Sequence, residues 1–324
     1  MKRIETMRGF SRKNMRVMLA LLLAALNVAN AQPDNAPSLE GIIDLHAHVA
    51  PETELLNFRR AFDALEAAQI ASIYGMRGIV LKEHHTETAS WAYLVSRVVP
   101  DVEVYGGIVL NRAVGGLNPV AVEAMALSRG RHGKLVYMPT IDAEYRNANP
   151  STAVPVTRNG ELLPEVHEVL AMVAKYDLGL STGHVSPEET KMVIRAAKEA
   201  GVNKIYVQHP NHSGMAVSMA DMKEMIRLGA FIEVVLSGDG LTGGGPDEVD
   251  MVNPANDFGP QKLADMRELG PENIVLTTDL GQPNRVDYAR AYQMALVVLA
   301  DSGFSQEEID LMTKHNPARF LGLE

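Results

Sequence analysis

Short apolar segments and longer amphipathic segments alternate along this chain from residue 41 onward, at intervals of roughly 30 residues. Apolar runs rich in β-branched residues are typical of buried strands, and the amphipathic segments between them are typical of helices. The expected strands are Gly41–His46, Gly78–Lys82, Val102–Leu110, Lys134–Pro139, Leu178–Gly183, Lys204–Gln208, Ala230–Leu236 and Asn273–Thr278. The expected helices are Glu52–Tyr74, Thr86–Val98, Pro119–Ser128, Leu163–Tyr176, Pro187–Ala200, Ser218–Leu228, Gln261–Leu269 and Arg285–Ala300.

The residues at several element boundaries support this repeating strand and helix pattern. Ser186 precedes Pro187 and is followed by Glu189, which is a helix-start signal, and Gly201 follows the same helix as a stop signal. Eight such units close into a (β/α)8 barrel or lie open as a doubly wound sheet. No glycine-rich dinucleotide fingerprint follows the first strand, which favours the barrel. We therefore expect an α/β protein with one distorted, TIM-like barrel domain.

Two long irregular segments follow expected strands at their carboxyl ends. They are Ile141–Glu161 and the glycine-rich Ser237–Pro260. Active sites of barrels lie on that face, so we expect these segments to form a lid and the walls that set specificity. The alternative is that they are surface insertions without a role.

The composition limits the chemistry available to this chain. It has 324 residues, of which 46% are hydrophobic, and it contains no cysteine. Disulfides, thiolate nucleophiles and cysteine-ligated metal sites are therefore excluded. Any metal ion must be held by nitrogen and oxygen atoms.

The first 31 residues resemble a secretory signal peptide. Six basic residues precede the apolar run Val17–Ala25, and Ala29-Asn30-Ala31 matches an A-x-A cleavage pattern. The apolar stretch is shorter than the roughly 20 residues of a membrane helix, so no stable membrane anchor is expected. We predict cleavage near Ala31, export to the periplasm or beyond the cell, and a barrel domain over residues 32–324.

The charge of the predicted mature chain limits its partners. Residues 32–324 contain 24 basic and 39 acidic residues, a formal net charge of −15. Such a surface repels nucleic-acid phosphates and anionic lipids. A small-molecule substrate is the expected partner, and association into a homo-oligomer is left open.

Five side chains that can bind a metal lie at the ends of four expected strands. His46 and His48 lie two residues apart, which places both imidazoles on one side of an extended chain. His184, His209 and Asp279 follow the fifth, sixth and eighth strands. A barrel brings these positions together at one end, and imidazole with carboxylate suits zinc and related divalent ions. We expect a divalent metal site, most simply zinc, with one or two ions.

This constellation resembles the metal-dependent amidohydrolase superfamily. The final segment Asn316–Leu323 is also similar to the one with which many members close. The resemblance implies a distorted (β/α)8 barrel in which metal-activated water attacks an amide, ester or lactone bond. It implies metal ligation by His46, His48 and His184, while Asp279 both ligates metal and takes the proton of the nucleophilic water. His209 would ligate a second metal or polarise the scissile carbonyl.

The chain departs from the superfamily at the bridging position. Members with two metals carry a carboxylated lysine or a glutamate at the end of strand four, where this chain has Tyr137–Asp142 without a lysine. Lys82 instead ends the second expected strand, and we count it among the catalytic candidates. It is a carbamate that bridges two metals, an ammonium that binds a substrate anion or oxyanion, or a structural salt-bridge partner.

Four further residues are weaker candidates for substrate binding. His84 and His85 follow Lys82 at the mouth of the expected barrel, Asp142 follows the fourth strand, and His212 follows the sixth. Each has the alternative of a solvated or structural group. Glu233 lies within the seventh strand and is left unassigned, because its side chain faces either the barrel centre or the helices.

Three functions are compatible with this sequence. The leading one is a metal-dependent hydrolase that acts on a small molecule. The second is a metal-dependent decarboxylase or other lyase on the same scaffold, and the third is an exported binding protein without turnover. The substrate itself is not encoded in any motif.

Overall fold

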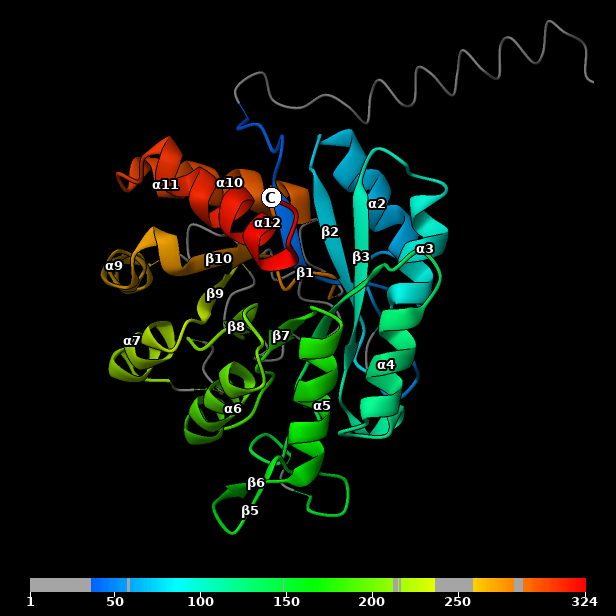
Figure 1. The fold of residues 1–324 in the computed structure, drawn as a ribbon. Helices are drawn as coiled ribbons and strands as arrows, with labels where there is room; N and C mark the ends of the chain where they lie inside the picture. Colours follow the sequence, from blue (N-terminus) through cyan, green and yellow to red (C-terminus); the bar gives the residue numbers. More distant parts are fainter. Residues whose placement is uncertain are drawn as a thin grey trace, which may run out of the picture. The chain divides into compact units, whose positions relative to one another are not determined.

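Eight parallel strands follow one another around a barrel in the order β1-β2-β3-β4-β7-β8-β9-β10 (Figure 1). The computed structural model describes residues 36–56, 59–147, 149–211, 215, 217–236, 259–282 and 288–324. Residues 38–324 form one compact unit. The ring is joined between its first and last strands, where the His48 amide donates to the Leu280 carbonyl at 2.8 Å and the Asp279 amide donates to the His46 carbonyl at 2.9 Å. The expected distorted (β/α)8 barrel is confirmed.

The strands lie where the apolar runs predicted them, and most are shorter by one or two residues at their ends. Each is buried because its side chains face either the barrel interior or the surrounding helices. The barrel strands are β1 (Ile43–His48), β2 (Gly78–Lys82), β3 (Glu103–Val109), β4 (Gly133–Tyr137), β7 (Gly179–Ser181), β8 (Ile205–Val207), β9 (Phe231–Val235) and β10 (Ile274–Thr277).

Helices cover the outside of the barrel between consecutive strands (Figure 1). They are α2 (Ala64–Ile73), α3 (Ala89–Ser96), α4 (Pro119–Leu127), α5 (Pro164–Lys175), α6 (Pro187–Glu199), α7 (Met219–Arg227), α9 (Pro260–Leu269) and α10 (Tyr288–Asp301). The start signal at Ser186 is a complete capping box with Glu189. No helix of the described ranges is both long and apolar enough to cross a membrane.

The first expected helix is wrong over residues 52–56 and 59–63. Helix α2 begins only at Ala64, because Asp63 forms a capping box that fixes the helix start there. The Asp63 carboxylate accepts from the Leu65 and Glu66 amides, both at 2.8 Å. Residues 52–56 and 59–62 are irregular instead, and Arg60 lines the cavity at the barrel mouth.

The carboxyl-terminal segment closes the amino-terminal end of the barrel. Helices α11 (Gln306–Asp310), η3 (Leu311–His315) and α12 (Asn316–Leu321) follow α10, and the sequence patterns did not predict them as separate helices. The Phe320 ring packs on Tyr206, with ring centroids 5.1 Å apart, inside the apolar interior of the barrel. This end is filled, and the cavity lies at the opposite, carboxyl-terminal end of the strands.

The long segment after β4 lies at that open end and has structure of its own. It contains a short antiparallel hairpin of β5 (Thr157–Arg158) and β6 (Glu161–Leu162). The second long segment, Ser237–Pro260, lies almost entirely outside the described residues, as do the predicted signal peptide and His212.

Candidate metal centre

Strand β1 directs two imidazoles toward one carboxylate. The Asp279 Oδ1 atom lies 3.0 Å from His46 Nε2 and 3.1 Å from His48 Nε2. The three residues each offer one ligand atom, and these atoms lie within 4.8 Å of one another. The alternation of side chains along a strand predicts that the two histidines share a side, but only barrel closure brings Asp279 to them.

The backbone at Asp279 has an unusual conformation that goes with this placement. Its φ angle is +50°, in the left-handed region that residues other than glycine rarely adopt. Two residues later, Gly281 has φ +120°, and a Cβ there would lie 1.9 Å from the carbonyl oxygen of His48. Only glycine allows the chain to pass this close to β1, and this close approach holds Asp279 beside the two histidines.

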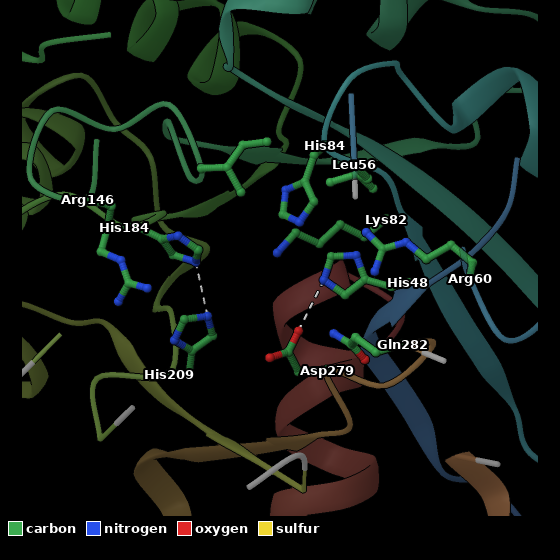
Figure 2. Close-up of a pocket in the computed structure, with 11 residues that line it drawn as sticks. His48, Leu56, Arg60, Lys82, His84, Arg146, His184, His209, Asp279 and Gln282 are labelled. Carbon is green, nitrogen blue, oxygen red and sulfur yellow. Dashed lines mark hydrogen bonds and ion pairs between the residues drawn. The ribbon is translucent and has the colours of Figure 1, made fainter. Parts of the chain in front are cut away.

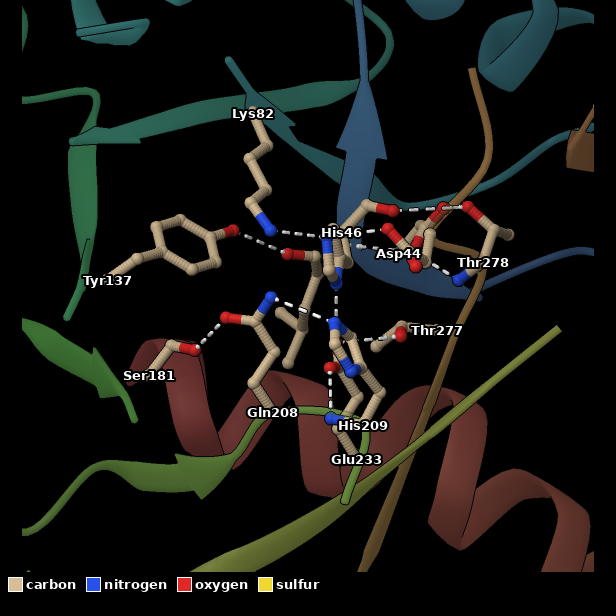
Figure 3. Close-up of polar contacts among 12 residues, drawn as sticks. Asp44, His46, Lys82, Tyr137, Ser181, Gln208, His209, Glu233, Thr277 and Thr278 are labelled. Carbon is tan, nitrogen blue, oxygen red and sulfur yellow. Dashed lines mark hydrogen bonds and ion pairs between the residues drawn. The ribbon is translucent and has the colours of Figure 1, made fainter. Parts of the chain in front are cut away.

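Glu233, which the sequence left unassigned, faces the barrel centre and holds the far side of His46 (Figure 3). Its Oε1 atom lies 2.8 Å from His46 Nδ1 and accepts from the Thr277 hydroxyl at 2.9 Å. Its Oε2 atom accepts from the His209 amide at 2.9 Å. A carboxylate that accepts from Nδ1 leaves the Nε2 lone pair of His46 directed at Asp279, as in metal sites where a carboxylate orients the ligand histidine. The sequence contained one sign of this role, namely a carboxylate within an otherwise apolar strand.

Lys82 lies at the same centre. It is 1% exposed, and its Nζ lies 2.7 Å from His46 Nε2 and 4.7 Å from the centre of the Tyr137 ring (Figure 3). Burial lowers the pKa of Lys82 to about 8, although Asp279 and Glu233 oppose the shift. Tyr137 ends β4 where two-metal members of the superfamily carry their bridge, so that position supplies no carboxylate here.

His184 and His209 form a second pair across the cavity from His48 (Figure 2). Their Nε2 atoms lie 3.1 Å apart, and the Gln208 amide nitrogen lies 3.2 Å from His184 Nε2 and 3.1 Å from His209 Nε2. Ser181 fixes that amide by donating to its oxygen at 2.9 Å. The five predicted ligands are thus arranged as a group of three and a neighbouring pair.

His48 and Asp279 of the first group and both histidines of the second line a cavity of about 250 Å³ at the carboxyl end of the strands (Figure 2). This volume lies below the usual range for drug-sized ligands, so it suits a small substrate. The lining residues are His48, Leu56, Arg60, Lys82, His84, Ile141, Arg146, His184, His209, Asp279 and Gln282.

Burial keeps most of the histidines of the cavity neutral. It lowers the pKa of His209 to about 4, and it lowers the pKa of His184 well below its usual value, with His209 adding to the effect. Burial and the nearby Arg60 act in the same direction on the pKa of His48. Burial would raise the pKa of Asp279, but His46 and His48 outweigh it and hold that pKa well below its usual value. The pKa of His46 is raised instead, because Asp279 and Glu233 outweigh the effects of burial and Lys82. Metal ligation requires neutral imidazoles, so a bound ion would displace the proton that these carboxylates favour on His46.

The group of three fits a divalent ion such as zinc. Bond lengths of 2.0 to 2.2 Å and tetrahedral angles place two zinc ligands about 3.3 Å apart. The distances from Asp279 Oδ1 to the two Nε2 atoms, 3.0 and 3.1 Å, are close to this value. His46, His48 and Asp279 would supply three ligands to such an ion, the number that protein residues supply in catalytic zinc sites. The nitrogen and carboxylate donors also suit related divalent ions.

The weaker candidates for substrate binding differ in whether they line the cavity. His84 lines the cavity, and its Nδ1 lies 3.0 Å from the Thr140 hydroxyl. His85 and Asp142 do not line the cavity: His85 Nδ1 lies 2.9 Å from Thr53 Oγ1, and Asp142 accepts from the Arg112 amide at 2.9 Å.

Asn111, which the sequence reasoning did not select, ties the loops behind His84 together. Its Nδ2 donates to the His84 carbonyl at 3.0 Å and to Thr140 Oγ1 at 2.9 Å. Its Oδ1 accepts from the Thr140 amide at 2.9 Å. Asn111 is fully buried, so these hydrogen bonds fix the loops after β2, β3 and β4 relative to one another.

A family model described as a family of unknown function, DUF6282, matches residues 41–233. The match covers more than half of the chain and includes every proposed ligand except Asp279. No curated protein has significant sequence similarity to this chain.

Solved structures with the same fold include organophosphorus hydrolase from Deinococcus radiodurans. It has 15% identity and a TM-score of 0.55, over 88% of this chain and 93% of that one. A mutant PTE-like lactonase from the same organism has 14% identity and a TM-score of 0.54, over 89% and 97%. A structure described as molecular engineering of organophosphate hydrolysis activity from a weak promiscuous lactonase template has 15% identity and a TM-score of 0.55, over 89% and 97%. At these identities the likeness shows the barrel fold alone.

Proposed function

The chain belongs to the DUF6282 family of unknown function, and we propose that it is a metal-dependent hydrolase of an ester or lactone bond in a small molecule. One observation carries this proposal: His46, His48 and Asp279 converge at a cavity whose opposite wall presents two neutral histidines. The names of the structural neighbours, which include a lactonase and organophosphate hydrolases, support ester-like bonds as the first class to test.

A divalent ion at this group, which we propose to be zinc, would supply the Lewis acidity that activates water and polarises a carbonyl. Residues of the chain would do the remaining work. Asp279 stays ionised because His46 and His48 hold its pKa low. Its position at the cavity wall allows it to accept the proton of an attacking water.

His184 and His209 would position the substrate from the opposite wall. Both are neutral, so a ring N–H of either can donate to a carbonyl oxygen or to the oxyanion that develops from it. Gln208 restricts where this donor lies, because its amide contacts both Nε2 atoms. The same pair can instead take a second ion, which would need a bridge.

The number of ions depends on Lys82. We propose one ion and an ammonium at Lys82, because Asp279 and Glu233 favour the charged form of Lys82 and a site with one metal needs no bridge. A carbamate on Lys82 that bridges two ions is the alternative. Elemental analysis of the purified protein and of Lys82→Ala separates them. Unchanged metal content with lost activity supports the ammonium, and loss of about one equivalent of metal supports the bridge.

The test of the function is turnover by protein reconstituted with zinc, manganese or cobalt. A panel of lactones, carboxylic esters and phosphotriesters is assayed by acid release. We expect acid release from at least one class, and its loss in Asp279→Ala and His48→Ala. The control is His167→Ala, because His167 is an exposed residue on the outer helix α5.

Two results would contradict the proposal. One is full activity in both ligand variants, and the other is metal-replete protein that turns over no member of the panel. Release of carbon dioxide from a carboxylic acid substrate would instead indicate a decarboxylase. A measured ligand affinity without any turnover would indicate a binding protein.

We also propose that the protein is exported after cleavage near Ala31. The support is the order of basic residues, apolar run and small residues in the first 31 positions. Expression of the full chain with a carboxyl-terminal tag, followed by fractionation and amino-terminal sequencing, tests it. A product in the exported fraction that begins at Gln32 is expected, and an intact amino terminus in the cytoplasm would contradict it.

A further inference from the structure

The cavity carries more positive charge than its proposed chemistry requires. Arg60, Lys82 and Arg146 line it, and Asp279 is the only acidic residue among the described lining residues. The protein as a whole has a formal net charge of −10. An acidic protein that concentrates arginine and lysine around one cavity creates a local field that attracts anions.

Arg146 is the most exposed of the three basic residues that line the cavity. It belongs to the long segment after β4, and its backbone amide donates to the Ala143 carbonyl at 2.9 Å in a tight turn. Its side chain is exposed and lies on the cavity wall beside His184 (Figure 2). Within the part of the chain that the structure describes, no carboxylate forms an ion pair with its guanidinium.

Arg60 approaches from the opposite side of the cavity, beside Lys82 and Gln282 (Figure 2). It is 7% exposed, and its guanidinium lies 3.8 Å from Glu83 Oε1, which is also buried. A separation of 3.8 Å makes this a loose ion pair. The Glu83 carboxylate therefore lies near Arg60, whose side chain lines the cavity.

Two apolar side chains complete the wall around these charges. Leu56 precedes Arg60 in the same irregular segment, and Ile141 precedes Arg146 in the segment after β4. The cavity thus offers hydrocarbon contact next to guanidinium groups, an arrangement suited to a small molecule with an apolar part and an anionic part.

We propose that the substrate of this site carries an oxyanion group, a carboxylate or a phosphate, which Arg146 binds while the scissile bond lies at His46, His48 and Asp279. The proposal rests on the proposed function for the bond that is cleaved. A neutral substrate would displace the water around the guanidinium groups without replacing its hydrogen bonds. A planar guanidinium binds a carboxylate or a phosphate through two parallel hydrogen bonds, so Arg146 also orients the molecule.

The first test measures binding and needs no turnover. Isothermal titration calorimetry compares glutarate with glutaramide, which has the same chain with neutral ends, and with inorganic phosphate. It uses the full protein with and without zinc, the variant Arg146→Gln and the control Arg158→Gln. Arg158 is an exposed arginine of the same long segment that does not line the cavity.

We expect glutarate or phosphate to bind at least about tenfold more tightly than glutaramide. Arg146→Gln should weaken the anion about 5- to 20-fold, because Arg146 is exposed before binding, and should leave glutaramide within about twofold. Arg158→Gln should change neither. Tighter binding of phosphate than of glutarate identifies phosphorylated substrates, and the reverse identifies carboxylates. Equal binding of the charged and neutral compounds, or equal loss in both variants, would overturn the proposal.

A second measurement separates this inference from the proposed hydrolysis. Metal-replete enzyme is given one lactone with a carboxylate substituent and the same lactone with a carboxamide. A higher kcat/KM for the carboxylate, reduced toward the carboxamide value in Arg146→Gln, supports both proposals. Selective anion binding without any turnover would contradict the proposed hydrolase and support the anion site. Turnover that favours the carboxamide would leave the hydrolase and refute the anion site.

Discussion

Replacing Glu233 with glutamine tests whether a buried carboxylate sets the metal affinity of this centre. Glu233 accepts three hydrogen bonds, from His46 Nδ1 at 2.8 Å, the His209 amide at 2.9 Å and the Thr277 hydroxyl at 2.9 Å. Glutamine has the same shape, but it carries one acceptor oxygen and one amide donor. The variant therefore changes hydrogen bonding and charge while keeping the packing.

Neither orientation of the new amide satisfies both neighbours and also leaves His46 able to bind a metal. If its oxygen faces His46, its NH2 group faces the N–H of His209, and two donors oppose each other. If its NH2 group faces His46, Nδ1 must act as the acceptor, which places the ring proton on Nε2 and blocks ligation. Losing one hydrogen bond of a charged, buried group costs about 1.5 to 3 kcal/mol. This corresponds to a loss of roughly 10- to 100-fold in metal affinity, the range expected for residues that orient metal ligands.

The assay is competition for zinc between the protein and a chromophoric chelator, with circular dichroism to verify folding. Thr277→Val is the matched control, since it removes one bond to Glu233 and retains the carboxylate. We expect less than about a tenfold loss of affinity in the control. Wild-type zinc affinity in a folded Glu233→Gln protein would refute the reasoning, because His46 would then be oriented without the carboxylate.

Three further outcomes follow from the geometry. Gly281→Ala should lower the free energy of unfolding by about 3 kcal/mol or more, since its Cβ would lie 1.9 Å from the His48 carbonyl oxygen. Gly160→Ala, also at positive φ but with nothing within 4 Å, should cost only about 1 kcal/mol, and equal midpoints of thermal unfolding would contradict the close approach. Asn111→Ala should destabilise by about 2 to 4 kcal/mol in urea denaturation, because it leaves buried loop groups unsatisfied, and a loss under 1 kcal/mol would show that the network is replaceable. Lys82→Met should preserve metal content and lower kcat at least about tenfold, whereas unchanged kcat would show that the ammonium does not assist the reaction.

The sequence by itself determined the strand order, the barrel and most of the residues at its mouth. Strands buried on both faces read as continuous apolar runs, and each βα unit has local start and stop signals. His46, His48, His184, His209 and Asp279 were found because residues after parallel strands share one end of a barrel. This inference needs only positions along the chain, so small errors in strand boundaries did not affect it.

Only the tertiary structure decided which of these groups meet and what surrounds them. Glu233 could not be assigned because a strand buried on both faces has no polar side in its sequence to indicate its orientation. The sequence did not identify Arg60 as a cavity residue, because it lies in a segment that was predicted to be helical. The apolar periodicity extends to residues before Asp63, but the helix begins only after that cap. The grouping of His46 and His48 with Asp279, apart from His184 and His209, depends on ring closure between β1 and β10 and on the left-handed turn at Asp279. Such contacts join residues more than 200 positions apart, and no local pattern in the sequence records them.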